Sequence, residues 1–306
     1  MRSRSRSDLR IALASAVIAL ATMAGCRLFV DLEGLGDGAP LGNDGAAVPD
    51  VTSNDGATTD AGSDVTTIPD VIEEPLPDGA CPSRGGPTPV RVTSGTTSFC
   101  IDSTEVTRDQ YDAFLKSSPP AGVAECAWKL ASGYVPSLEW PPLPATRSLP
   151  VVGVDWCDSK AFCAWAGKRL CGAIGGGALS PAELSLSARS EFVFACSNGG
   201  TRVYPYGNAY NPNTCNGEDL AAGRVLAVGS LAGCTGPAPA IYDMSGNVHE
   251  WLNGCETSAD AGPQDQRCGL SGSAFTHPSA DMACNVVETA ERSARVNEFG
   301  IRCCSP

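Results

Sequence analysis

Histidine is scarce in this 306-residue sequence: His249 and His277 are the only two, and no Cys-x-x-Cys pair is repeated. Both absences argue against a zinc-held fold, which needs four cysteine or histidine ligands at short spacings. Basic residues are also few, with 21 lysines and arginines against 34 aspartates and glutamates, and they form no basic patch. We therefore expect no nucleic-acid partner. No internal repeat is visible, which argues against a solenoid.

The chain also lacks an apolar run of membrane-spanning length. The run Ile11–Ala24 is shorter than the roughly 20 residues that such a helix needs, and several arginines precede it, so residues 1–26 have the features of a secretory signal peptide. The run ends in Met23-Ala24-Gly25-Cys26, which resembles a bacterial lipobox, although Met23 stands where leucine is preferred. We expect lipidation of Cys26 and anchoring to the bacterial cell envelope through this lipid only, facing the periplasm or the cell surface. Simple secretion is the alternative.

Residues 27–80 contain little that could build a core. They hold 12 acidic residues against Arg27 alone, and Phe29 is their one aromatic residue. Low apolarity with high charge of one sign is typical of disorder, because little buried area would offset the entropy of ordering. We expect a disordered acidic linker. Calcium binding by its aspartates is disfavoured because no EF-hand spacing is present.

Cysteine, in contrast, is abundant. Of the 15 cysteines, all but Cys26 lie after residue 80, which leaves 14 for the segment 81–306. An even, dense set in an exported chain predicts a framework of disulfides and an oxidising, extracytoplasmic compartment. The adjacent Cys303 and Cys304 are expected to bridge to different partners.

The segment 81–306 alternates short strands, helices and loops. A strand is expected at Ser98–Asp102, followed by a helix capped by Thr107 with Gln110 and ended by Pro119-Pro120. A second strand at Val151–Val154 precedes a helix that Asp155 caps and Gly167 stops. A third helix is expected within Leu186–Cys196, with Ser180–Glu183 capping a short turn of its own. After Gly199 turn residues dominate, and no long regular element is expected.

Seven stretches between Phe99 and Cys303, taken together and in this order, resemble the formylglycine-generating-enzyme family, also called the sulfatase-modifying-factor domain. They are "IDSTEVTRDQYDAFL", "LPVVGVDWCDSKAFCAWAGKRL", "SEFVFACSNGG", "VYPYGN", "YDMSGNVHEW", "SGS" at Ser271–Ser273 and "FGIRC". The resemblance implies an α+β fold, loop-rich and disulfide-stapled, related to C-type-lectin-like modules.

The resemblance also implies two disulfides. Cys163 matches the family cysteine that bridges to "FGIRC", here Cys303, and Cys196 matches one whose partner is best sought at Cys284. Proximity suggests three further pairs, and elimination leaves two more, although sequence alone does not determine connectivity. The five are Cys81–Cys100, Cys215–Cys234, Cys255–Cys268, Cys126–Cys157 and Cys171–Cys304.

The stretch "YDMSGNVHEW" matches a loop that wraps a structural calcium ion in the family. Asp243 and Glu250 match side-chain ligands, and Gly246 and Val248 match carbonyl donors. Hard oxygen ligands from a tight turn suit calcium, and a hydrogen-bonded turn without metal is the alternative. His249 stands where the family usually has tryptophan, and a hydrogen-bonding role is its more ordinary interpretation. A second family calcium site near Asn216-Gly217 is not expected, because its downstream aspartate is missing.

The family's oxidase binds copper(I) through two cysteines that follow the Ser271–Ser273 motif. Counted from Ser273, these positions are Thr276 and Asp281, a hydroxyl and a carboxylate that suit copper(I) poorly. Copper is therefore not expected. Ser273, Thr276 and Asp281 are interpreted as degenerate catalytic positions. Thr276, His277 and Asp281 offer too few ligands for a 2-His-1-carboxylate metal site unless His249 joins them.

Two hypotheses about function follow. In the first, the domain is a non-catalytic binding or scaffold module whose ligand is a protein or a glycan, since function depends on a site and the family's site is missing. In the second, it is an enzyme, either a formylglycine-generating oxidase with a displaced cysteine pair or another oxidoreductase that uses the same cleft. The number of free thiols in the folded domain distinguishes the two.

Overall fold

The computed structural model describes residues 80–117, 119, 124–129, 133–238 and 240–306. The expected signal peptide, Cys26 and the acidic linker up to residue 79 lie outside these residues. Backbone contacts divide the chain into Met1–Ile68 and Pro69–Pro306, and every described residue belongs to the second unit. Within the described residues, no helix is both long and apolar enough to cross a membrane.

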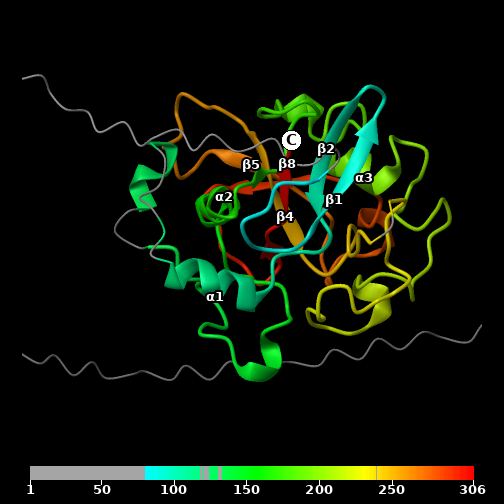
Figure 1. The fold of residues 1–306 in the computed structure, drawn as a ribbon, viewed down its shortest axis with the longest axis horizontal. Helices are drawn as coiled ribbons and strands as arrows, with labels where there is room; N and C mark the ends of the chain where they lie inside the picture. The colour runs from blue at the N-terminus through cyan, green and yellow to red at the C-terminus, as the bar shows by residue number, and fades with distance from the viewer. Residues whose placement is uncertain (1–79, 118, 120–123, 130–132, 239) are drawn as a thin grey trace, which may run out of the picture. The chain divides into compact units, whose positions relative to one another are not determined.

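Two small sheets form the centre of the fold (Figure 1). The first contains, in spatial order, β1 (Pro89–Ser94), β2 (Thr97–Asp102), β8 (Cys303–Ser305) and β3 (Arg169–Leu170). The second contains β6 (Glu288–Glu291), β5 (Arg267–Ser271), β4 (His249–Cys255) and β7 (Phe299–Gly300). All pairs are antiparallel except β4 with β7, which run parallel. Because β8 lies between β2 and β3, the first sheet joins segments about 200 residues apart in sequence.

Three α-helices begin at side-chain caps. In α1 (Arg108–Lys116) Thr107 and Gln110 form the expected capping box. In α2 (Trp156–Trp165) Asp155 forms one with Asp158, and the helix ends before Gly167, whose φ of +71° suits glycine. The third, α3 (Glu191–Ser197), is capped by Ser190. Five 3-10 turns complete the set: η1 (Ala124–Lys129), η2 (Pro144–Thr146), η3 (Pro181–Glu183), η4 (Glu218–Leu220) and η5 (Ser279–Asp281).

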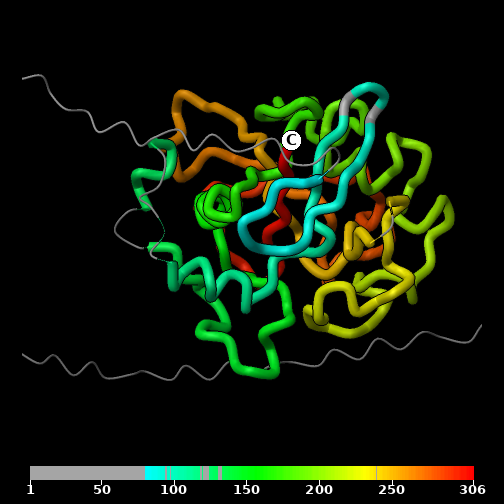
Figure 2. The backbone as a smooth tube through the Cα atoms, in the orientation of Figure 1, coloured from blue at the N-terminus to red at the C-terminus, as the bar shows by residue number. Residues whose placement is uncertain are grey.

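One expectation about these elements is wrong, and two others are met. Val151–Val154 is buried chain but not a strand, because Gly153 turns the backbone at a φ of +70° and its neighbours bond to separate segments. The third helix spans Glu191–Ser197, so it begins inside the expected range Leu186–Cys196 and ends one residue beyond it. After Gly199 the backbone follows an irregular path up to β4 (Figure 2, yellow-green to yellow), and among the described residues the strands that follow span at most seven residues, in line with the expectation of no long regular element.

The core has two main parts. In one, α1 and α2 pack their aromatic side chains together, with Tyr111 stacked on Phe162 at 5.6 Å between ring centroids. In the other, α3 packs against β2 through side chains such as Phe192, Phe99 and Ile101. Trp251 on β4 is fully buried in the first part and donates its indole N–H to the Val154 carbonyl (3.1 Å). The loop-rich α+β expectation is therefore confirmed.

Seven disulfides join all 14 cysteines of the described segment. The pairs are Cys81–Cys100, Cys126–Cys157, Cys163–Cys303, Cys171–Cys304, Cys196–Cys284, Cys215–Cys234 and Cys255–Cys268. They are the pairs expected from the sequence, and Cys303 and Cys304 do bridge to different partners. Such a density of disulfides places the domain in an oxidising, extracytoplasmic compartment.

Candidate functional site

The loop that precedes β4 is a buried, internally hydrogen-bonded turn. Asn247, at a φ of +67°, directs its side chain to three segments: it accepts from Asn216 and from the Leu226 N–H and donates to Glu105. Gly246 has a φ of +81°, and a Cβ there would lie 2.5 Å from the Asn216 carbonyl oxygen. The turn therefore requires glycine, and it fixes the carboxylates on either side of it.

Those carboxylates lie around one buried positively charged side chain, that of Arg302. Arg302 is fully buried and places Nε and Nη2 3.0 Å from the same oxygen of Glu250, Oε1. Asp243 and Glu105 are also buried near it, and Asp243 accepts the Gly229 N–H. Burial raises the pKa of Glu250 to about 8 and also raises the pKa values of Asp243 and Glu105, although Arg302 opposes each shift. Fully ionised, the three carboxylates would carry more negative charge than one guanidinium offsets, so burial favours their protonated forms unless a further cation is bound.

This arrangement fits the calcium ligands implied by the family. The second oxygen of Glu250, Oε2, is buried and has no hydrogen-bond partner, so it is free to bind a cation. Asp243 lies at the other end of the same turn, and the Gly246 and Val248 carbonyls lie between the two acids in sequence. A hard divalent cation with oxygen ligands would offset the excess negative charge.

The positions that match the copper cysteines do not form a copper site. Thr276 donates its hydroxyl to Glu298 (2.9 Å), and Asp281 ends the turn η5. Ser273 is buried at a φ of +61°, and its hydroxyl has no hydrogen-bond partner. Cys284, the nearest cysteine in sequence, is bonded to Cys196. The described segment therefore offers no free thiolate for copper(I).

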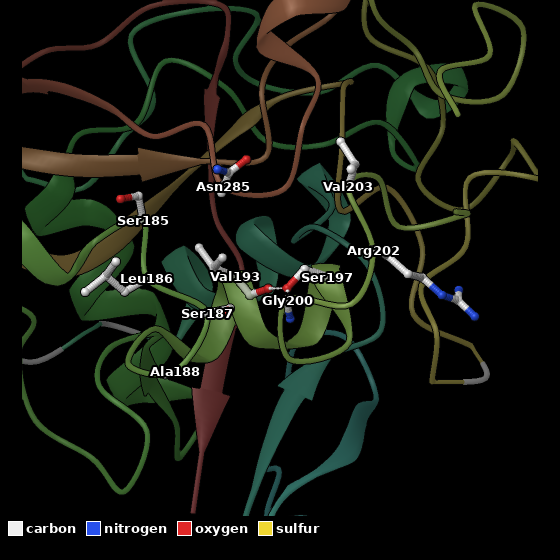
Figure 3. Close-up of a pocket in the computed structure, with 10 residues that line it drawn as sticks. All are labelled: Ser185, Leu186, Ser187, Ala188, Val193, Ser197, Gly200, Arg202, Val203 and Asn285. Carbon is white, nitrogen blue, oxygen red and sulfur yellow. Dashed lines mark hydrogen bonds between the residues drawn. The ribbon is translucent and has the colours of Figure 1, made fainter. Parts of the chain in front are cut away.

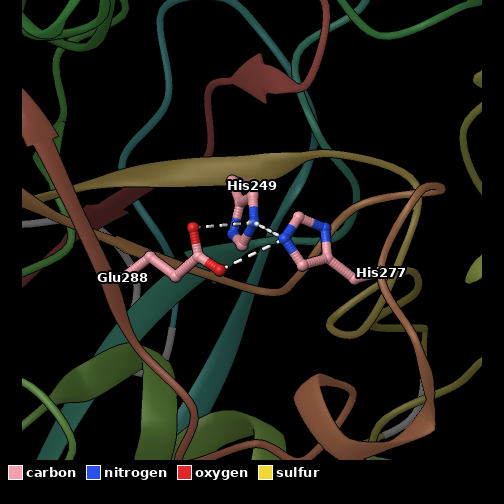
Figure 4. Close-up of side chains that lie close together, drawn as sticks. All are labelled: His249, His277 and Glu288. Carbon is pink, nitrogen blue, oxygen red and sulfur yellow. Dashed lines mark hydrogen bonds and ion pairs between the residues drawn. The ribbon is translucent and has the colours of Figure 1, made fainter.

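A different cluster lies beside Thr276 and involves both histidines. The Nε2 atoms of His249 and His277 are 3.4 Å apart, and the Glu288 carboxylate lies 3.1 Å from the ring of His277 and 3.9 Å from that of His249 (Figure 4). Among the described residues these three alone form a His, Cys, Asp or Glu set whose ligand atoms all lie within 4.8 Å of one another. His249 and Glu288 are the first residues of β4 and β6, and His277 lies in the loop before η5.

Strand pairing explains why these residues meet. Trp251 is opposite Leu270, and Leu270 is opposite Glu288, so the three side chains share one face of the second sheet. His249 precedes Trp251 by two residues and therefore lies on that same face. Burial, and then the neighbouring His277, lower the pKa of His249 to about 3, so its imidazole is neutral near pH 7.

The sequence expectations covered this cluster only in part. They named His249 and His277 and allowed that the two might belong to one metal site, but they paired His277 with Thr276 and Asp281 and did not include Glu288. Asp281 is not a member of the cluster. The signal that could have pointed to Glu288 is the register of β5 with β6, which a single sequence does not reveal.

The described residues also enclose a hollow that is not lined by His249, His277 or Glu288. It has a volume of about 420 Å³ and borders α3 through Val193 and Ser197, with Arg202 and Asn285 also in its lining (Figure 3). It contains none of the candidate ligands, and the arginine side chain extends away from the other lining residues in Figure 3. The hollow and the histidine cluster therefore have no residue in common.

The fold, the turn before β4 and the Ser271–Ser273 segment together define a formylglycine-generating-enzyme type of domain without its copper thiolates. Residues 67–305 match the family model described as "Sulfatase-modifying factor enzyme 1-like domain". The match spans most of the chain, which therefore belongs to this family.

Two curated relatives illustrate the range of the family. The chain is 32% identical over 174 residues to "Inactive C-alpha-formylglycine-generating enzyme 2" of Bos taurus, a match covering 51% of this chain and 50% of the relative. It is 30% identical over 115 residues to "Formylglycine-generating enzyme" of Mus musculus, covering 34% and 27%. The chain thus spans about half the length, or less, of these two relatives.

Two solved structures are similar to the chain at lower sequence identity. PvdO from Pseudomonas aeruginosa is 21% identical with a TM-score of 0.46, and the match covers 68% of this chain and 80% of PvdO. CarF is 19% identical with a TM-score of 0.45, covering 74% and 96%.

Proposed function

We propose that this chain is a cell-envelope lipoprotein whose sulfatase-modifying-factor domain is a non-catalytic binding or scaffold module. The observation that carries the proposal is the chemistry of the two copper positions: Thr276 and Asp281 supply no thiolate, and all 14 cysteines from Cys81 onward are in disulfides. Soft thiolates are what holds copper(I) for oxygen activation. In the proposal, Cys26 carries the lipid, the acidic segment 27–80 is the tether, and the domain binds a protein or glycan ligand.

The purified domain is expected to leave a sulfatase-type cysteine peptide unconverted. Incubated with copper-loaded protein and oxygen, the peptide should retain its cysteine mass, because the two ligand positions are hard oxygen donors. Mass spectrometry of the peptide measures this. The variant with both Thr276→Cys and Asp281→Cys is the matched comparison, and its copper content shows whether the loop still accepts the metal. A formylglycine product from the unmodified protein would favour the oxidase alternative instead.

We also propose that the turn before β4 binds calcium through Asp243, Glu250 and the Gly246 and Val248 carbonyls. The support is the partnerless Glu250 Oε2 and the excess of buried carboxylates around Arg302. Bound calcium would compensate this charge and so stabilise the folded state.

Calcium is expected to raise the melting temperature of chelator-treated protein by about 5–10 °C when present at about 100 times its Kd, equivalent to roughly 2.7 kcal/mol. Scanning calorimetry with and without calcium measures the shift. Glu250→Gln should remove most of it, whereas Glu256→Gln, an exposed carboxylate just beyond β4, should not. Equal melting temperatures with calcium and with chelator would contradict the site.

A further inference from the structure

The histidine cluster brings together more lone pairs than protons. His249 Nε2, His277 Nε2 and a Glu288 oxygen converge, yet a neutral imidazole carries one N–H, on only one of its two nitrogens. If the proton is on His277 Nε2, that proton must serve both Glu288 and His249. If it is on His249 Nε2 instead, the Glu288 oxygen faces the lone pair of His277. A cation at the centre would satisfy all three atoms at once, which hydrogen bonds alone do not.

The distances fit a small metal ion. Ligand atoms held 2.0–2.2 Å from a tetrahedral ion lie about 3.3–3.6 Å from one another. The observed separations are 3.4 Å between the two imidazole nitrogens and 3.1 Å from His277 Nε2 to Glu288 Oε1. The third separation, from His249 Nε2 to Glu288 Oε2, is 3.9 Å, and a small rotation of the partly exposed Glu288 side chain would bring the three ligand atoms around one ion.

The surroundings of His277 have the outer contacts of a metal ligand. Its other nitrogen, Nδ1, lies 3.4 Å from the Thr276 hydroxyl, which in turn donates to Glu298 (2.9 Å). A chain of carboxylate, hydroxyl and imidazole orients the ring so that Nε2 points into the cluster. Thr276, which stands at a degenerate copper position, thus has a new role as a positioning residue for His277.

The donor set selects the class of ion. Two imidazoles and one carboxylate suit divalent first-row transition metals such as zinc, iron and cobalt, whereas copper(I) prefers sulfur and calcium prefers oxygen alone. His249 is almost completely buried, but the side chains of His277 and Glu288 are 17% and 44% exposed. The ion can therefore be reached from solvent, and three protein ligands leave a coordination position for water or another ligand.

We propose that His249, His277 and Glu288 bind a divalent transition-metal ion of the zinc class. The site differs from both metal sites implied by the family in residues and in ligand chemistry. It does not depend on the proposed function, because a binding module can hold such an ion as well as an enzyme can.

Titration calorimetry of the untagged, chelator-treated chain with zinc, in calcium-containing buffer, tests the proposal. The expected result is one zinc ion per chain, with Kd at least about tenfold weaker in His277→Ala and in Glu288→Gln. Glu291→Gln, at the other end of β6, is the matched control and should bind as the unmodified protein does. Both test variants alter partly exposed side chains, so circular dichroism should show folded protein.

The spectrum of the cobalt-loaded chain gives a second measurement. Imidazole and carboxylate ligands in a four-coordinate site should produce visible absorption bands that zinc displaces and that His277→Ala lacks. Zinc binding that is absent, or that remains unchanged in both His277→Ala and Glu288→Gln, would overturn the proposal. The presence or absence of copper-dependent activity does not affect this result. The metal-site proposal and the proposed function can therefore be contradicted independently.

Discussion

Replacing all four of Cys163, Cys303, Cys171 and Cys304 with alanine is expected to unfold the domain at room temperature. The two bridges are nearly parallel, with sequence separations of 140 and 133 residues, and both end on β8. With one of them intact, the other closes a ring of only about nine residues, which is worth about 2.5 kcal/mol by loop entropy. Either bridge alone is therefore expected to be dispensable.

The double removal is expected to cost more than the sum of the two single removals. Cys196–Cys284 already closes 88 of the 133 residues between Cys171 and Cys304, which leaves a loop of about 45 residues worth about 4 kcal/mol. Losing both bridges should thus cost roughly 6–7 kcal/mol, which is comparable to the total stability of many domains. The expected non-additivity arises because each bridge retains most of the constraint that the other imposes.

Urea unfolding of the two single-bridge variants and the four-alanine variant measures these values. Removal of Cys255–Cys268, whose separation is only 13 residues, is the control and should cost about 3 kcal/mol without coupling to the β8 bridges. Additive losses from the two β8 bridges would show that strain or packing, rather than loop closure, determines their contribution.

Lys168→Met is expected to destabilise the domain by roughly 3–5 kcal/mol above pH 7, because it leaves a buried carboxylate without its nearest cation. Lys168 pairs with Asp102, and both side chains are almost completely buried. Asp102 also accepts the Cys303 N–H, so the pair stabilises the junction of β2 with β8. The exposed pair of Lys116 with Asp112 on α1 is the matched control, and Lys116→Met should cost less than about 0.5 kcal/mol.

The loss should depend on pH in a defined direction. Burial raises the pKa of Asp102 to about 6 even with Lys168 present, whereas the ordinary value is 3.8. The folded state therefore holds this proton more tightly, and the contribution of Asp102 to stability falls as pH rises from about 4 to about 6. Without Lys168 the pKa rises further, so the variant should nearly match the original at pH 4 and fall increasingly behind at higher pH. A deficit that is constant with pH would show that lost packing, not charge, is the cause.

Local features of this fold were predictable because their causes are local. Thr107 with Gln110, Asp155 before α2 and Gly167 after it act within one helical turn, and the sequence contains all the information that such caps need. The disulfide pairs were accessible for another reason: several separations are short, and the resemblance to the family supplied the longest.

The histidine cluster could be predicted only in part because its geometry depends on register. Glu288 lies near His249 only because β6 pairs with β5 through Glu288 and Leu270, while β5 pairs with β4 through Leu270 and Trp251. A shift of either pairing by one residue would direct Glu288 to the opposite face. The strand predicted at Val151–Val154 was wrong for a related reason. An apolar run predicts burial but does not determine whether a strand partner is present.

The central position of β8 has a consequence for how the protein is made. Cys303 and Cys304 leave the ribosome after every other described element, yet β8 must lie between β2 and β3 before the first sheet exists. The four bridges with separations of 13 to 31 residues need only a short segment of chain, whereas the two that end on β8 require segments more than 130 residues apart to meet. Until Cys303 and Cys304 are available, Cys163 and Cys171 can pair with incorrect partners, so oxidative refolding in vitro should be faster with a disulfide isomerase that corrects such early mispairing.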